Sequence, residues 1–459
     1  MSTSIDDYLS KNAGRFEDEL CDLLRIPSVS ADSTRKPDVR RAADWVAAQF
    51  RNLGLAVEIC ETAGHPIVYA EHVKAPGAPT VLVYGHYDVQ PPDPLNLWHS
   101  PPFEPTRRNG NIYARGATDD KGQMFTHIKS AEAWLKTSGT LPVNLKFLIE
   151  GEEEVGSAHL EEFIATNKAK LKSDVCVVSD TSQFGPNMPA ITYGLRGIAY
   201  FELILNGPDR DLHSGTFGGA VVNPAGALVK ILTKLVDGDG RIQVPGFYDD
   251  VVALTEAERK KYRELPYDEA EFMQSIGVGA LGGEVGYTNL ERRSARPTCD
   301  INGLTSGYQG EGAKTVLPAR ASAKFSFRLV PNQDPAKIAA SLKKFLADNI
   351  PAGIKHELIT YHGGSGIVVD LNSPYVAAAE RAITHGFGIK PLYIREGGSI
   401  PVVSTFHELL GIDTLLLGWG LNDDNTHSPN EKFCLADFHR GIKSSAALWD
   451  EIGKMRKGS

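Results

Sequence analysis

Residues 81–89 read VLVYGHYDV, an apolar run that ends in polar side chains. This pattern is typical of a strand buried inside a sheet, with chemically active groups at its end. Two further apolar runs, VNLKFLIE at 143–150 and VCVVSD at 175–180, also end in acidic residues, and helical patterns occupy 122–139 and 157–171 between the strands. Alternating strands and helices indicate an α/β sheet, in which ligands bind beyond the carboxyl ends of the strands. We therefore expect the three strand ends to converge on one site.

The pattern changes near residue 195. Strand-like segments with alternating apolar residues follow at 191–207, 321–331 and 356–363, and helical segments follow at 220–236 and 334–350. This order indicates a second, α+β domain.

After about residue 366 the chain returns to a helix, a strand and a helix. The predicted fold class is therefore α/β, with a mixed central sheet that is flanked by helices and interrupted by an inserted α+β domain. A length of 459 residues is also more than one core usually holds. We predict that residues 1–195 and 366–459 form the first domain and that residues 196–365 form the insertion.

Composition argues against several classes of protein. The formal net charge of −9 and the lack of a Lys/Arg-rich run argue against a nucleic-acid partner. No segment has the roughly 20 uninterrupted apolar residues of a membrane span. The N-terminus lacks the features of an export signal, so we expect a cytoplasmic protein without a membrane partner. The 5 cysteines are scattered and never in CxxC spacing, which argues against a disulfide framework or a thiolate metal site.

Two motifs combine residues that suit metal binding. His86 and Asp88 lie two residues apart at the end of the first strand, so their side chains leave the same side of an extended backbone. The pair suits a histidine that binds a metal and a carboxylate that orients it. In ATDDKG, Asp119 and Asp120 follow a turn that contains glycine. One of them could bridge two cations through its two oxygens, or could cap the next helix.

The other motifs add acids and a histidine. Glu152, Glu153 and Glu154 follow the second strand, where repulsion between like charges has to be offset. A cation would offset it, with one glutamate as a ligand and a neighbour as the proton carrier. Asp180 ends the third strand, and His427 lies in the polar segment DDNTHSPNE. The combined set contains oxygen and nitrogen donors without sulfur, which suits Zn²⁺, Mn²⁺ or Co²⁺ better than Ca²⁺.

These five segments, in this order and with an insertion between the fourth and the fifth, resemble the M20 metallopeptidase family over nearly the whole chain. The strings DLHSG, RLVPN and REGGSIP are most similar to its cytosolic non-specific dipeptidase and carnosinase branch. The resemblance implies a metal-binding catalytic domain, an inserted lid and dimerisation domain, and a homodimer as the active unit.

The resemblance also implies which residues bind two divalent ions, with Zn²⁺ as the first choice. Asp119 would bridge the ions, and its peptide bond to Asp120 would be cis. The other four ligands would form one pair for each ion, namely His86 with Asp180 and Glu154 with His427.

Further roles follow from the same resemblance. Glu153 would be the general base, although Glu152 competes with it on charge alone, and Asp88 would orient the neighbouring histidine. His213 of DLHSG would reach the site of the partner subunit and stabilise the oxyanion. Arg328 would suit a substrate carboxylate because a guanidinium pairs with it bidentately. The residues that would contact the substrate are Thr315, Arg328, His362, Glu396 and Ser399. The remaining histidines match no position of the family, and we interpret them as structural.

The predicted activity is hydrolysis of the peptide bond of dipeptides or short peptides, by a water shared between two ions and a glutamate base. An N-acyl-amino-acid or succinyl-diaminopimelate-type deacylase has the same ligand set, so an N-acyl amino acid remains an alternative substrate. A non-catalytic metal-dependent binding protein on the same fold is a third interpretation. The presence of every expected ligand and of the base argues against it.

Overall fold

The computed structural model of the protein describes residues 3–455, apart from the side chains of Thr3 and His362. Its contacts divide the chain into two compact units. The first unit comprises Met1–Tyr193, Val369–Ile394 and Thr405–Ser459, and the second comprises Gly194–Val368 and Arg395–Ser404. None of the helices in the described part of the chain is long and apolar enough to cross a membrane.

A mixed sheet forms the centre of the first unit, as the sequence predicted. Its strands lie in the order β1 (Ala56–Cys60), β2 (Ile67–His72), β6 (Asn144–Glu150), β3 (Thr80–His86), β7 (Val175–Val178), β17 (Thr414–Leu416) and β8 (Ala190–Leu195). The four strands from β6 to β17 are parallel, and the outer pairs are antiparallel. The end of β8 also pairs with β15 (Ile367–Val368) and β16 (Leu392–Glu396).

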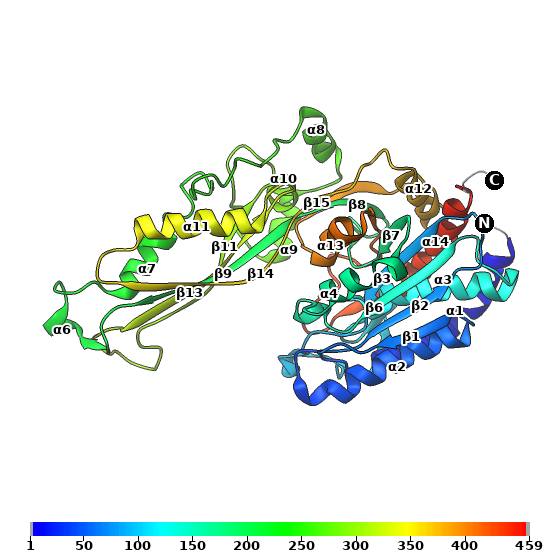
Figure 1. The fold of residues 1–459 in the computed structure, drawn as a ribbon, viewed down its shortest axis with the longest axis horizontal. Helices are drawn as coiled ribbons and strands as arrows, with labels where there is room; N and C mark the ends of the chain where they lie inside the picture. Colours follow the sequence, from blue (N-terminus) through cyan, green and yellow to red (C-terminus); the bar gives the residue numbers. More distant parts are fainter. Residues whose placement is uncertain (1–2, 456–459) are drawn as a thin grey trace. The chain divides into compact units, whose positions relative to one another are not determined.

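Helices cover this sheet (Figure 1). They are α1 (Thr3–Leu24), α2 (Lys36–Asn52), α3 (Lys121–Ser138), α4 (Leu160–Thr166), α5 (Lys168–Leu171), α12 (Pro374–Phe387), α13 (Pro401–Leu410) and α14 (Leu435–Gly453). Helix α3 packs on β3, α1 and α14, so all of its first 13 residues are buried. A small sheet of β18 (Lys432–Cys434), β5 (Asn111–Tyr113) and β4 (Thr106–Arg108) joins two loops that come from distant parts of the sequence.

The helix expected over 157–171 is broken at Asn167. This residue has φ −114° and ψ 23°, outside the helical region, and its side-chain amide donates to the carbonyl of Phe163. Asparagine competes for backbone hydrogen bonds in this way, which disfavours it inside helices. Two short helices, α4 and α5, therefore replace the predicted single helix.

The second unit contains an antiparallel sheet in the order β11 (Thr298–Ser306), β13 (Arg320–Leu329), β9 (Gly197–Asn206) and β14 (Lys355–Gly364). Helices α7 (Pro224–Leu232) and α11 (Pro335–Asn349) contact its strands, and a buried apolar cluster fills the space between them (Figure 1). The remaining elements are β10 (Leu212–His213), α6 (Ser214–Phe217), α8 (Glu256–Glu264), α9 (Glu269–Ile276), α10 (Asn289–Ser294) and β12 (Val316–Leu317).

One local expectation for this region was wrong, and one stretch has elements that were not predicted. The segment 191–207 is two strands, β8 and β9, which belong to different sheets. The stretch between α7 and β13, for which the sequence predicted no elements, contains strands β11 and β12 and three short helices. Two of these helices begin with capping boxes, Thr255 with Glu258 and Thr288 with Glu291. That signal is readable in the sequence.

The domain boundaries drawn from the sequence, after residues 195 and 365, remain predictions. The boundaries between the compact units lie within a few residues of both positions, and residues 395–404 also belong to the second unit. Hydrogen bonds account for this assignment, because the Arg196 guanidinium donates to the carbonyl of Gly397 and the Ser399 hydroxyl donates to the carbonyl of Arg196.

Candidate metal centre

The candidate site lies at the carboxyl ends of three neighbouring parallel strands of the first unit, β6, β3 and β7. His86 is the last residue of β3, and Asp180 follows β7 by two residues. Gly85 is required beside His86, since a Cβ atom there would lie 2.8 Å from Asp120 Oδ2. That carboxylate accepts the backbone N–H of His86 at 3.3 Å. Asp120 therefore supports the strand end, while its neighbour Asp119 faces the histidines.

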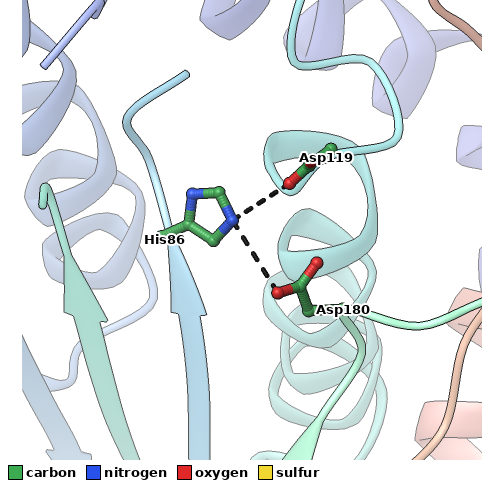
Figure 2. A group of neighbouring side chains, drawn as sticks. All are labelled: His86, Asp119 and Asp180. Carbon is green, nitrogen blue, oxygen red and sulfur yellow. Dashed lines mark ion pairs between the residues drawn. The ribbon is translucent and has the colours of Figure 1, made fainter. Parts of the chain in front are cut away.

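Two groups of side chains share Asp119. In the first group, His86 Nε2 lies 3.2 Å from Asp119 Oδ1 and 4.0 Å from Asp180 Oδ2 (Figure 2). In the second group, His427 Nε2 lies 2.9 Å from Asp119 Oδ2 and 3.3 Å from Glu154 Oε2. Each oxygen of Asp119 thus faces a different histidine. The peptide bond between Asp119 and Asp120 is cis, as the resemblance implied.

Asp88 connects the two groups from behind. Its Oδ1 lies 3.4 Å from His86 Nδ1, and its Oδ2 accepts the backbone N–H of Glu154 at 3.1 Å. His86 Nδ1 also lies 3.1 Å from the backbone carbonyl of Asp88. With its Nδ1 held in this way, the His86 ring presents Nε2 to the carboxylates, which is the arrangement expected of an oriented ligand histidine.

The three consecutive glutamates have different surroundings. Glu152 accepts the backbone N–H of His65 at 3.1 Å and pairs with His159 Nδ1 at 2.7 Å. Glu153 is instead influenced by His86, Glu154 and Asp119, and burial together with the two acids raises its pKa to about 7. Charge alone did not distinguish Glu152 from Glu153. Their surroundings favour Glu153 as the residue available for proton transfer.

The electrostatics of the cluster favour a cation. Burial and the nearby Asp119 carboxylate raise the pKa of Asp180 well above its usual range. Burial opposes a charge on His86, yet the nearby carboxylates of Asp119 and Asp88 raise its pKa well above the ordinary value. The cluster thus gathers several carboxylates around two histidines. A divalent ion would offset the repulsion between these acids, because it can bind several oxygens at once.

The residues fit a pair of metal ions on further grounds. His86 Nε2 and Glu154 Oε1 are buried and have no hydrogen-bond partner among the described residues. Buried polar atoms in this state usually face a water or an ion. Each group offers one nitrogen and two carboxylates, so three protein ligands per ion would leave a position for water or substrate.

The predicted substrate residues lie in the second unit, in two places. Arg328 donates from Nη1 to Ser399 Oγ at 2.8 Å, so the structure brings these two together. Glu396 is the last residue of β16 and lies in segment 395–404, as Ser399 does. His213 is exposed in the two-stranded sheet of β10 and β12. The backbone N–H of its neighbour Ser214 donates to the backbone carbonyl of Thr315. The side chain of His362 lies outside the described residues.

Several other histidines have structural partners, as expected. His65, His127, His159 and His439 bind a backbone carbonyl, a serine and two glutamates, respectively. The sequence interpretation missed Gln90, which donates from Nε2 to Glu154 Oε2 at 2.7 Å. It continues the two-residue spacing of His86 and Asp88, and this spacing was the available signal.

Comparison with known proteins agrees with this geometry. The profile of Peptidase family M20/M25/M40 matches residues 82–451. The Cys-Gly metallodipeptidase dug1 of Schizosaccharomyces pombe is 36% identical over 99% of this chain and 100% of its own. The human Beta-Ala-His dipeptidase is 35% identical over 96% of this chain and 86% of its own, in agreement with the carnosinase-like branch. The crystal structure of the metallo-carboxypeptidase Sso-CP2 from Sulfolobus solfataricus has a TM-score of 0.87 and 36% identity, covering 96% of this chain and 99% of its own. This chain belongs to the M20/M25/M40 peptidase family.

Proposed function

We propose that this protein hydrolyses the peptide bond of dipeptides with the help of two divalent ions, which the two groups that share Asp119 would hold. The observation that carries the proposal is the carboxylate of Asp119, whose two oxygens face two different histidines. Similarity to two dipeptidases supports dipeptides as the substrate class. Zn²⁺ is the proposed ion, with Mn²⁺ or Co²⁺ as substitutes, because the donors are nitrogen and oxygen without sulfur. The proposed location is the cytoplasm.

The proposed ligands are His86 and Asp180 for one ion, Glu154 and His427 for the other, and Asp119 for both. Ions bound there would lower the pKa of a water molecule toward about 7, which is the chemistry that they supply. Glu153 then accepts a proton from the attacking water and donates it to the departing nitrogen. Its raised pKa of about 7 suits both transfers at neutral pH. Asp88 keeps His86 oriented throughout.

The second unit would supply recognition. Arg328 would pair with the carboxylate of the substrate, and its hydrogen bond to Ser399 supports this role because it restricts the guanidinium. Thr315, His362 and Glu396 are proposed as further substrate contacts. His213 would stabilise the oxyanion of the partner subunit's site in a homodimer.

The substitution Glu153→Gln tests the base. It keeps the shape of the side chain but cannot take a proton, so we expect turnover to fall by about 10²–10⁴-fold while bound metal stays unchanged. Steady-state rates and elemental analysis of the purified protein measure the two quantities. Glu152→Gln is the matched control, because Glu152 is held by His65 and His159. A Glu153→Gln enzyme with nearly normal turnover would rule out this role.

A substrate panel tests the class of substrate. We expect unmodified dipeptides to be cleaved with higher kcat/KM than N-acetyl or N-succinyl amino acids, and with higher kcat/KM than tripeptides. Preference for the acylated compounds would favour the deacylase, and preference for longer peptides would favour a carboxypeptidase. No hydrolysis of any compound by metal-loaded protein would favour a binding protein.

A further inference from the structure

Glu431 is a buried carboxylate outside the ligand set, in the same polar loop as His427. It is fully buried, and its two oxygens accept four hydrogen bonds from a single short segment. Oε1 accepts the backbone N–H groups of Thr118 at 3.0 Å and Asp119 at 3.1 Å. Oε2 accepts the N–H of Gly116 at 2.9 Å and Arg115 Nη1 at 2.8 Å.

All four partners are N–H donors, so the side chain acts as an acceptor on both oxygens. Three of these hydrogen bonds come from backbone N–H groups, whose positions are fixed by the chain. One side chain therefore restrains the whole segment 115–119. That segment ends in Asp119, the aspartate shared by the two candidate metal groups.

A second set of contacts ties the same two loops together. The Thr118 hydroxyl donates to the carbonyl of Lys432 at 2.6 Å, and its oxygen lies 2.9 Å from Asp424 Oδ2. The backbone of Glu431 accepts the N–H of Ala114 at 3.1 Å. The loop between Asp424 and Lys432 carries His427, whose side chain is 57% exposed. Surface packing therefore does little to hold this histidine, and its position depends on the loop that bears it.

We propose that Glu431 is a positioning residue of the metal pair. Its hydrogen bonds fix the backbone of Asp119 relative to the loop that carries His427. The inference rests on the proposed metal centre and goes beyond it, because it assigns the alignment of two ligands to a side chain outside both ligand groups. Partners of this kind typically change metal affinity by about 10–100-fold when they are removed.

The test compares Glu431→Gln with Glu132→Gln in metal-free and metal-loaded protein. Glutamine has one carbonyl oxygen, so it cannot accept on both sides and its NH₂ group meets N–H donors. Glu132 is a matched control, being a buried acid of the first unit that is paired with Lys129 and Arg15, away from the ligands. Zn²⁺ binding is measured by competition with a chromogenic chelator, and thermal unfolding is recorded without metal.

For Glu431→Gln we expect Zn²⁺ affinity to fall by about 10–100-fold and turnover to recover when Zn²⁺ is raised. For Glu132→Gln we expect a lower unfolding temperature but wild-type Zn²⁺ affinity. Wild-type affinity in Glu431→Gln would overturn the inference, even if the metal-free protein is less stable. If Glu431→Gln does not fold, Thr118→Val removes the hydroxyl that links the same loops and should weaken Zn²⁺ binding in the same direction; unchanged affinity there would also overturn the inference. Failure of the unmodified protein to bind two equivalents of Zn²⁺ would instead refute the metal centre itself.

Discussion

The two units differ in how they hold their candidate functional residues. In the first unit, His86 and Asp88 are completely buried and each is fixed by contacts at short range, while His427 is the exposed exception. In the second unit, His213 and Thr315 are exposed, and Arg328 is held by one hydrogen bond to Ser399. Catalysis benefits from groups that are fixed in advance, whereas recognition tolerates groups that adjust to a ligand. We therefore expect substitutions in the first unit to affect metal binding and turnover, and those in the second to affect substrate affinity.

The largest effect is expected for Asp119→Asn, because this residue is shared by both groups. Loss of the charge should weaken both ions together, so bound metal should fall from two equivalents toward none. The loss of kcat/KM should exceed the 10–100-fold that is typical of an outer partner. Elemental analysis and steady-state kinetics measure these quantities.

Asp120→Asn is the control for this experiment. Its side chain is buried next to Asp119 but contacts the backbone of His86 instead of the ring. Loss of only one ion in Asp119→Asn, or equal effects of the two substitutions, would mean that Asp119 is not shared.

A smaller effect, confined to substrate binding, is expected for Arg328→Lys. Lysine keeps the charge but loses the planar pair of donors. A charge-assisted hydrogen bond contributes about 1.5–3 kcal/mol, which corresponds to about 10–100-fold in kcat/KM. We expect the change mainly in KM, with metal content unchanged.

Arg320→Lys is the matched substitution, as Arg320 is exposed on the same strand β13. A dipeptide with an amidated C-terminus sharpens the test, because it lacks the carboxylate that Arg328 would bind. If Arg328→Lys lowers activity on the amide as much as on the free acid, Arg328 does not recognise the carboxylate.

The smallest effect concerns pH and stability in the first unit. Burial lowers the pKa of His127 to about 3, and its ring lies 2.8 Å from the hydroxyl of Ser179, the residue before Asp180. In the unfolded chain the His127 ring takes up a proton near its ordinary pKa of 6.5, whereas in the folded protein the ring stays neutral. Above pH 6.5 the ring is neutral in both states, so the full stability is retained. That stability is lost as the pH falls from 6.5 toward 3, by at most about 1.4 kcal/mol per pH unit for one proton.

His127→Gln should therefore reduce the acid dependence of the free energy of unfolding. Urea unfolding between pH 4.5 and 7.5 measures it, and His356→Gln, at an exposed histidine of the second unit, is the control. Equal slopes for wild type and His127→Gln would show that His127 is already protonated or open to solvent in the folded protein.

Much of the first unit was predictable because its signals are local. The apolar runs that end in GHYD, IEGEEE and VVSD identified β3, β6 and β7, and the rule for α/β sheets put their ends together. The second unit was harder to predict. Its strand β11 is largely exposed, so it has no apolar pattern, and the division between β8 and β9 falls within one continuous strand-like stretch.

The sequence by itself determined the fold class, the family and the set of residues suited to bind metal, because these depend on residue type and spacing along the chain. The resemblance had already selected Asp119 over Asp120 and Glu153 over Glu152, and only the tertiary structure showed the different surroundings of these neighbours, because surroundings depend on the folded chain. The tertiary structure alone brought Glu431 to the backbone of Asp119, across more than 300 residues of sequence. Hydrogen bonds between distant loops leave no periodic pattern in the chain, and they exist only once both loops are folded.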